Sequence, residues 1–346
     1  MALSAEAVPR LEAWLAPAIG AEVAQVLGSE RLGGGAIQEN LGLEVEVEGG
    51  PRHGRHALVL RTDAPSGLPV SWNRTQEFAI LRVAHGAGVA APEPWVQCDD
   101  AAVLGKPFYL MARARGEARG VRLVRDPAVL ARGEGLAARL GAELALLHRL
   151  TPPVAGLDFI PVPESSPASA RVAEYRRHLD AMGLHEPVLE WALAWLERNE
   201  PESRRTCLVH ADFRTGNYLV LDGELTAILD WEFAAFSDPH EDLGWMLMRY
   251  WRFGAEAKEA GGVGSRAALL DGYEASAGWP VDREEAVPYW EVMGAVRWAV
   301  IALMQAARHY RDREASLELA LTAHVLPVLE LDLLTRVAEI EGGRGR

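Results

Sequence analysis

The sequence predicts an α+β protein in which a strand-rich N-terminal part precedes a larger, mostly helical part. Its 346 residues are enough for two modest domains or for one large domain with two lobes. From Leu43 to Val47, apolar residues alternate with acidic ones, which is the period of a strand. The segment 136–150 instead repeats its apolar residues at helical spacing, and so do most later segments. We therefore predict a small lobe over residues 1–112 and a large helical lobe over residues 113–346.

The small lobe begins with an amphipathic helix over residues 3–18, because Leu11 and Leu15 fall on one apolar stripe. A glycine-rich turn follows this helix, and Gly49-Gly50-Pro51 reverses the chain between two strands. A further helix and a hairpin complete the lobe. In order, the expected elements are the turn at 31–36, strands at 43–47 and 57–61, a helix at 73–85, and a hairpin of Val103 with residues 108–112.

The large lobe is expected to be helical apart from one β segment. Glycine and proline break the helical pattern at two places after residue 241. The expected elements are helices at 136–150, 169–182 and 186–199, a β segment at 207–229, and helices from 241 to the end with breaks near 261–264 and 278–280.

The composition is that of an ordinary globular protein, and it narrows the classes of partner. Apolar residues make up 49% and charged residues 24%, which excludes a collagenous or wholly disordered chain. A formal net charge of −14 suits a phosphate backbone poorly, so we expect no nucleic-acid partner. No apolar run approaches the roughly 18 residues that span a bilayer, and the two cysteines predict buried thiols without a disulfide framework. A cytoplasmic location without membrane contact is the default expectation, and the oligomeric state stays open.

Two oxygen-bearing side chains are expected to meet at the open end of a hairpin. The apolar stretches Tyr218–Leu221 and Leu225–Leu229 flank Asp222-Gly223, which is a hairpin signal. Antiparallel pairing then sets Asn217 opposite residues 228–230, and so close to Asp230. Mg²⁺ prefers hard oxygen ligands, usually one or two from the protein together with substrate phosphates. The hairpin therefore predicts a magnesium site.

The loop that enters this hairpin carries a candidate general base. Asp212 lies five residues before Asn217, where its carboxylate could accept a hydroxyl proton and orient that hydroxyl. His210 is placed to brace the loop. Mutual repulsion would make Asp212, Asp230 and Glu232 costly neighbours without a cation. We therefore interpret four residues as one site, although each of them alone is equally well explained as a turn former: His210, Asp212, Asn217 and Asp230. Glu232 is expected beside this site or at the surface.

The pattern of this segment resembles the aminoglycoside phosphotransferase and choline kinase family, whose fold is protein-kinase-like. The resemblance is carried by His210-Ala-Asp-Phe-Arg-Thr-Gly-Asn217, by Ile-Leu-Asp230-Trp-Glu, and by Asp238-Pro239 with Asp242. It is especially similar to bacterial phosphotransferases related to those fused to acyl-CoA dehydrogenases. The chain has Ala and Ser where the family usually has the glycines of His-Gly-Asp and Gly-Asp-Pro.

The resemblance implies a role for each matching residue. Asp212 corresponds to the catalytic base, while Asn217 and Asp230 correspond to the ligands of Mg²⁺. Asp242 would brace the catalytic loop, with a helix N-cap as the alternative. The implied fold is an α+β, two-lobed, protein-kinase-like one.

The small lobe matches the nucleotide-binding side of the same family. The run Gly33, Gly34, Gly35 and Ala36 lies where the family has its phosphate-covering loop, and glycines let backbone N–H groups approach phosphate oxygens. The segment from Phe108 to Gly116 resembles the family's strand that leads into the hinge between the lobes, so backbone groups near Met111, Ala112 and Ala114 would bind adenine. The usual phosphate-binding lysine is replaced by Arg61, with Glu77 as its expected partner.

We therefore predict an ATP- and Mg²⁺-dependent kinase that phosphorylates a hydroxyl of a small molecule. An aminoglycoside, an amino alcohol, a sugar and a hydroxyacyl compound all remain open as acceptors. The alternative is a catalytically silent nucleotide-binding module of the same fold, against which the intact Asp212, Asn217 and Asp230 argue. A protein kinase is disfavoured because no activation segment is recognisable between Asp230 and Asp238.

Overall fold

The computed structural model describes residues 3–33, 38–63, 71–202, 205–310 and 316–344. It divides into two compact units, here called the strand unit and the helical unit. The predicted boundary after Ala112 stays a prediction. The strand unit comprises Met1–Gly116, Ala155–Phe159 and Thr226–Phe233, and the helical unit comprises Glu117–Val154, Ile160–Leu225 and Ala234–Arg346.

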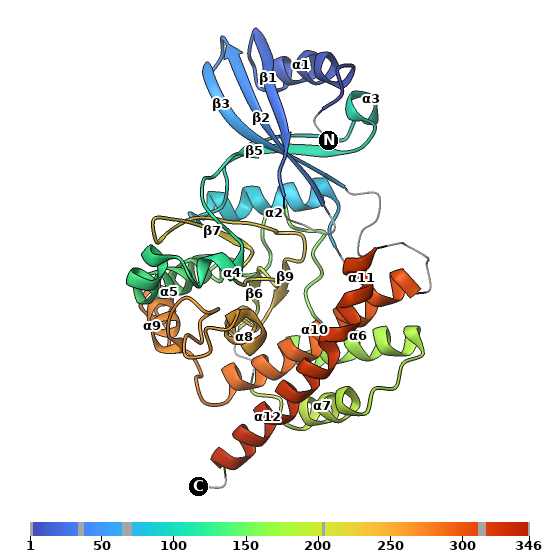
Figure 1. The fold of residues 1–346 in the computed structure, drawn as a ribbon, viewed down its shortest axis with the longest axis vertical. Helices are drawn as coiled ribbons and strands as arrows, with labels where there is room; N and C mark the ends of the chain where they lie inside the picture. The colour runs from blue at the N-terminus through green and yellow to red at the C-terminus, as the bar shows by residue number, and fades with distance from the viewer. Residues whose placement is uncertain (1–2, 34–37, 64–70, 203–204, 311–315, 345–346) are drawn as a thin grey trace. The chain divides into compact units, whose positions relative to one another are not determined.

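The strand unit is built on a five-stranded antiparallel sheet (Figure 1). The predicted alternation is confirmed in its second strand, where Leu43, Val45 and Val47 are all fully buried. Arg61 lies on the third strand, opposite Tyr109 of the neighbouring strand. The strand order is β1 (Val23–Arg31), β2 (Gln38–Glu48), β3 (Gly54–Asp63), β5 (Phe108–Ala112) and β4 (Pro94–Cys98).

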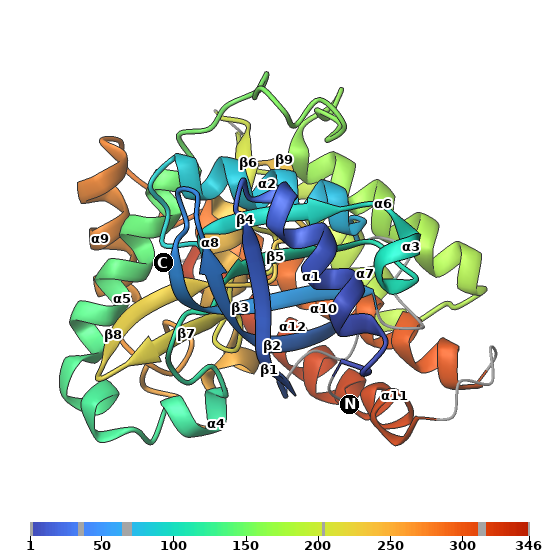
Figure 2. The same cartoon turned by 90° about the horizontal axis from the view of Figure 1, so that it is seen from above.

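Helices α1 (Ala7–Ala18) and α3 (Ala101–Leu104) lie close together on the sheet (Figure 2). Leu11 and Leu15 of α1 are fully buried in the same apolar core as the sheet. The expectation that Val103 forms a strand was wrong, because it lies in α3. Asp100 caps that helix by accepting a hydrogen bond from the backbone of Ala102.

Helix α2 (Arg74–Gly86) confirms the helix predicted at 73–85. A capping box starts it: the Asn73 side chain accepts from the backbone N–H of Gln76, and the Gln76 side chain accepts from that of Asn73. Arg74 and Glu77 then lie three residues apart, on one buried face of the helix. The cap therefore fixes where two charged side chains enter the interior of the strand unit.

The helical unit has its main apolar core between α6, α7, α8, α10 and α12 (Figure 1). Elsewhere α5 packs closely against α9, and a Cβ added at Gly141 would overlap the carbonyl oxygen of Leu269. The helices are α4 (Gly120–Leu123), α5 (Pro127–Leu147), α6 (Pro167–Met182), α7 (Pro187–Arg198), α8 (His240–Leu247), α9 (Arg266–Ala277), α10 (Ala286–Tyr310), α11 (Leu317–Thr322) and α12 (Leu326–Arg344), with 3-10 turns η1 (Arg249–Arg252) and η2 (Ala323–Val325).

Two short sheets frame the segment that carries the sequence motif. β6 (Cys207–Val209) pairs with β9 (Ala235–Ser237), so His210 and Asp238 directly follow paired strands. β7 (Tyr218–Leu221) pairs with β8 (Glu224–Ile228), which confirms the predicted hairpin. The division between the two units falls within β8. Among the described residues, no helix is both long and apolar enough to cross a bilayer.

Candidate active site

Asp242 of α8 holds the backbone of the loop between β6 and β7, residues 210–217, here called the motif loop. Its Oδ2 accepts the N–H of His210 at 2.7 Å, and its Oδ1 accepts the N–H of Ala211 at 2.8 Å. His148, at the end of α5, contacts Oδ2 at 3.1 Å and is itself hydrogen-bonded to Tyr273 at 2.9 Å. Burial opposes the charge of Asp242, but its contacts with His148 and the backbone donors lower its pKa. The predicted bracing role of Asp242 is confirmed.

The hydrogen bond to Asp242 holds Ala211 in a left-handed conformation with φ of 60°. Such a conformation costs an L-residue roughly 1–2 kcal/mol, whereas glycine adopts it readily. Ala211 occupies the position at which the family that the motif resembles usually has glycine. Next to it, the buried His210 accepts the N–H of Asp212 on Nδ1 at 3.2 Å. His210 therefore ties its ring to the backbone of the loop, and its role in the site stays a prediction.

Asp212 is held by side chains on both of its oxygens. Its Oδ1 accepts from the indole Nε1 of Trp245 at 3.0 Å and from Nε of Arg214 at 3.2 Å. Its Oδ2 accepts from Nδ2 of Asn217 at 2.5 Å. The side chain is nevertheless 14% exposed. Asp212 is thus fixed in orientation and still reachable, which is what the orientation of a substrate hydroxyl requires.

The amide of Asn217 is oriented by Asp212. Its Nδ2 donates to the backbone oxygen as well as to Oδ2 of Asp212, at 2.9 and 2.5 Å. Because both partners are acceptors, the nitrogen must face them, and Oδ1 is the oxygen left for another ligand. An amide oxygen in this position fits the hard-oxygen preference of Mg²⁺.

The other charged residues of the predicted site, Arg61, Glu77 and Asp230, lie in the strand unit. Arg61 is only 4% exposed, and its expected pairing with Glu77 is confirmed by a hydrogen bond of 3.1 Å from Nε and an ion-pair contact of 3.0 Å from Nη2. Its Nη2 also contacts Oδ1 of Asp230 at 2.8 Å. Burial opposes the charge of Arg61, but nearby carboxylates, first among them Asp230, raise its pKa. Asp230 itself adopts a left-handed conformation with φ of 63°.

Arg74 is a second buried arginine in this cluster, and it is not among the predicted site residues. It contacts Glu77 through Nη1, Asp63 at 2.8 Å and Glu232 at 3.6 Å. Burial and the charge of Arg61 lower the pKa of Arg74. The spacing of Arg74 and Glu77 is a usable signal in the sequence, because residues three apart share one face of a helix.

The other predicted nucleotide-binding residues lie in the predicted glycine-rich turn, in strand β5 and directly after β5. Gly33 is described and exposed, whereas Gly34, Gly35 and Ala36 lie outside the described residues. Met111 is paired within the sheet, opposite Val59 and Pro94. The N–H of Ala112 already donates to the carbonyl of Glu93 at 2.8 Å. Ala114 follows the end of β5 and lies outside the strands.

The predicted site residues are divided between the two units. His210, Asp212 and Asn217 belong to the helical unit, and Arg61, Glu77 and Asp230 belong to the strand unit. The predicted meeting of Asn217 with Asp230 stays a prediction. Both cysteines are free and buried, as predicted, and burial raises the pKa of the Cys207 thiol.

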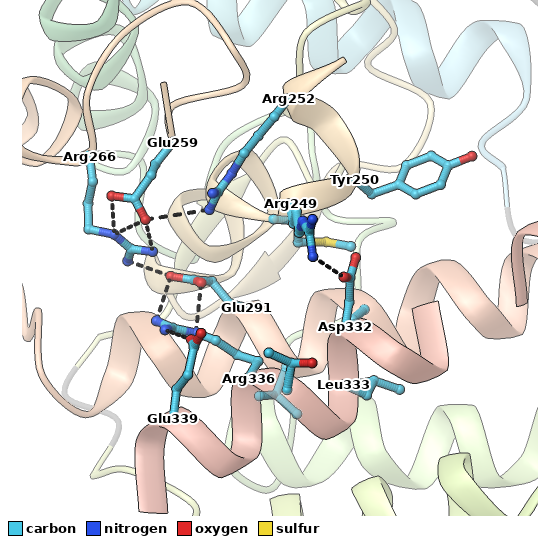
Figure 3. Close-up of a pocket in the computed structure, with 14 residues that line it drawn as sticks. Arg249, Tyr250, Arg252, Glu259, Arg266, Glu291, Asp332, Leu333, Arg336 and Glu339 are labelled. Atoms are coloured by element: carbon cyan, nitrogen blue, oxygen red, sulfur yellow. Dashed lines mark hydrogen bonds and ion pairs between the residues drawn. The ribbon is translucent and has the colours of Figure 1, made fainter. Parts of the chain in front are cut away.

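A separate pocket of about 260 Å³ lies in the helical unit between η1, α10 and α12 (Figure 3). Arginines and acids alternate along it: Arg266 and Arg336 both contact Glu291, at 2.5 and 3.0 Å, and Arg249 contacts Asp332 at 3.5 Å. These charges largely compensate one another. Neither Asp212 nor Asn217 is among the residues that line the pocket.

Comparison with known proteins gives one family match and several curated relatives. The model of the phosphotransferase enzyme family matches residues 30–283. Acyl-CoA dehydrogenase family member 11 of Rattus norvegicus is 30% identical over 206 residues, which is 57% of this chain and 26% of that protein. Acyl-CoA dehydrogenase family member 10 of Mus musculus is 29% identical over 203 residues, which is 56% of this chain and 18% of that protein. The chain thus matches about a quarter or less of the length of these relatives.

Solved structures share the fold over nearly the whole chain. A protein from Ralstonia eutropha JMP134, provisionally described as an aminoglycoside phosphotransferase, has a TM-score of 0.73 at 18% identity, covering 95% of this chain and 98% of that one. A choline/ethanolamine kinase family protein from Mesorhizobium loti has a TM-score of 0.54 at 20% identity, covering 90% and 92%. Spectinomycin phosphotransferase APH(9)-Ia, solved with ADP and spectinomycin, has a TM-score of 0.59 at 12% identity, covering 95% and 98%. These likenesses confirm the predicted α+β, protein-kinase-like fold.

Proposed function

The chain belongs to the phosphotransferase enzyme family, and on that premise we propose that it transfers the γ-phosphoryl group of ATP to a hydroxyl of a small molecule. The observation that carries the proposal is the Asp212 carboxylate, which is held on both oxygens and remains accessible. A fixed carboxylate of this kind can orient an acceptor hydroxyl and take its proton as the new bond to phosphorus forms.

Asn217 and Asp230 would hold Mg²⁺ in this proposal. Oδ1 of Asn217, which the contacts among the described residues leave open, and the partly exposed carboxylate of Asp230 would supply the oxygen ligands that the ion prefers. When bound, Mg²⁺ neutralises charge that develops on the phosphates. Asp230 would exchange its contact with Arg61 for this role.

Arg61 would bind the α- and β-phosphates in place of the usual lysine. Its Nε and Nη2 are anchored on Glu77, and Arg74 also contacts Glu77. Glu77 therefore keeps a cationic partner when Arg61 turns to a nucleotide. The loop from Gly33 to Ala36 would cover the phosphates, and the backbone near Met111, Ala112 and Ala114 would contact adenine. Of those three residues, Ala114 is the one outside the sheet.

The acceptor is proposed only as a class, namely a small molecule with a free hydroxyl. Two neighbours in fold carry the names of a choline/ethanolamine kinase family protein and a spectinomycin phosphotransferase, and the curated relatives carry those of acyl-CoA dehydrogenase family members. An amino alcohol, an aminoglycoside, a sugar and a hydroxyacyl compound are therefore all reasonable probes.

The test is a screen for ADP formation from Mg-ATP with ethanolamine, spectinomycin, gluconate and 4-hydroxybutyrate as acceptors. Asp212→Asn is the control, because it keeps the size of the side chain and removes the base. We expect at least one acceptor to raise ADP formation, and Asp212→Asn to lower that rate by about 10²–10⁴-fold. Nucleotide binding without ADP formation from any acceptor would instead favour the silent module. Equal rates in the parent and in Asp212→Asn would remove Asp212 from the mechanism.

A further inference from the structure

Helix α8 contacts the motif loop at two residues that lie one turn apart. Asp242 holds the backbone of His210 and Ala211, and Trp245, three residues later, donates its indole N–H to the carboxylate of Asp212. Residues three apart project from the same face of a helix. A single helix face thus fixes both the path of the loop and the orientation of its carboxylate.

The indole of Trp245 is itself held firmly. It is 2% exposed, and the guanidinium of Arg297 lies over its ring at 4.9 Å. The ring of Trp251 packs beside it, with centroids 5.4 Å apart. A Cβ added at Gly294 of α10 would come within 3.3 Å of the indole. A ring packed on several sides presents its N–H in one direction, so the bond to Asp212 has little freedom.

The acceptor capacity of Asp212 is divided unequally between its two oxygens. A carboxylate offers about four lone-pair sites, two on each oxygen. Trp245 and Arg214 use both sites of Oδ1, at 3.0 and 3.2 Å. Asn217 uses one site of Oδ2. Among the described residues, therefore, the contacts of this carboxylate leave one site, and it lies on Oδ2.

We propose that Trp245 and Arg214 saturate Oδ1 of Asp212 and thereby direct the acceptor hydroxyl to Oδ2. This inference rests on the proposed function and adds Trp245 to it as a positioning residue. In the step concerned, the hydroxyl oxygen bonds to the γ-phosphorus, the bond from that phosphorus to the oxygen of departing ADP breaks, and the hydroxyl proton passes to Oδ2. Because Asn217 contacts the same oxygen, the hydroxyl is delivered next to the proposed metal ligand.

The kinetic test compares Trp245→Phe with the matched control Trp290→Phe. Trp290 is equally buried, and its indole N–H makes no hydrogen bond within the described part of the chain. The probe is Mg-ATP with the best acceptor of the screen, and with water alone as a second acceptor. We expect Trp245→Phe to lower kcat by up to about 100-fold and to leave KM for Mg-ATP unchanged, because a misplaced reacting group affects turnover and not nucleotide binding. Trp290→Phe should keep both values.

A double-variant comparison separates positioning from packing. If Trp245 acts through Asp212, Trp245→Phe should cause no further loss in an Asp212→Asn protein. An equal loss in that background would overturn the inference, and so would equal kcat values in Trp245→Phe and Trp290→Phe. A parent protein that forms no ADP with any acceptor would instead overturn the proposed function.

A spectroscopic measurement tests the contact without any turnover. The indole N–H signal of Trp245, assigned by its loss in Trp245→Phe, should shift in the NMR spectrum of Asp212→Asn, because its charged acceptor has been replaced. The signal of Trp290 should stay in place. A Trp245 signal that does not move would show that the indole does not donate to Asp212, whatever the activity of the protein.

Discussion

Removal of Arg61 should weaken the binding of ATP far more than that of adenosine. Arg61 is buried on β3 and makes three contacts of 2.8–3.1 Å to Glu77 and Asp230, so its guanidinium is oriented before any ligand arrives. A hydrogen bond to a charged group contributes roughly 1.5–3 kcal/mol. At 1.4 kcal/mol for each factor of ten, Arg61→Ala should raise the Kd of ATP by about 10- to 100-fold. Adenosine lacks phosphates and should bind as before.

Calorimetric titration of ATP and adenosine into the parent, Arg61→Ala and Arg61→Lys measures this difference. Arg61→Lys keeps the charge but loses the planar fork, so its Kd for ATP should lie between the other two. Arg55→Ala is the matched control, because Arg55 lies on the same strand in an exposed pair with Glu44. Unchanged ATP affinity in Arg61→Ala would refute the phosphate-binding role. Equal losses for ATP and adenosine would show that the strand unit had been disrupted instead.

Three further predictions concern stability. Asp242→Asn should lower the free energy of unfolding by about 3 kcal/mol in urea titrations, because it leaves a buried backbone N–H facing an amide donor; a loss below about 0.5 kcal/mol would contradict the bracing role. Gly141→Ala should destabilise the protein, because the added Cβ would meet the backbone of α9. Gly135→Ala on the same helix is the control: its Cβ meets open space, and it should stabilise the protein by up to about 1 kcal/mol. Thermal melts that rank the two variants alike would refute the close approach of α5 and α9. Burial opposes the charge of Glu174, but His178 and Arg171 lower its pKa to about 2. The stabilising contribution of Glu174 should therefore be present above about pH 4.5 and be lost as the pH falls toward 2. The difference in unfolding free energy between the parent and Glu174→Gln should shrink over that range.

The parts of the site that the sequence predicted correctly are those set by local geometry. The hairpin follows from two apolar stretches around Asp222-Gly223, and it exists as β7 and β8. The positions of His210, Asp212 and Asn217 within one loop follow from their spacing. Each of these inferences needs only neighbouring residues, so the backbone itself determines the answer.

The parts that were missed depend on partners far away in the chain. His148 meets Asp242 across 94 residues, and Trp245 meets Asp212 across 33. Nothing in the sequence around a single histidine at the end of an apolar helix, or around one of many tryptophans, indicates which distant residue it will contact. Strand β1 was missed for a related reason: of its nine residues only Ala24 is buried, so it lacks the alternation that predicted β2.

Ala211 shows how a tertiary contact can support a departure from the family pattern. Its left-handed φ of 60° would be nearly free for glycine and costs alanine roughly 1–2 kcal/mol. The bond from its N–H to the Asp242 carboxylate involves a charged acceptor and contributes a similar amount, roughly 1.5–3 kcal/mol. Asp242 can therefore hold alanine in a conformation that the chain alone disfavours. It follows that Ala211→Gly should lessen the damage done by Asp242→Asn, since glycine adopts this conformation without help. Unfolding free energies of the single and double variants measure that coupling, and strictly additive losses would show that Asp242 does not support Ala211.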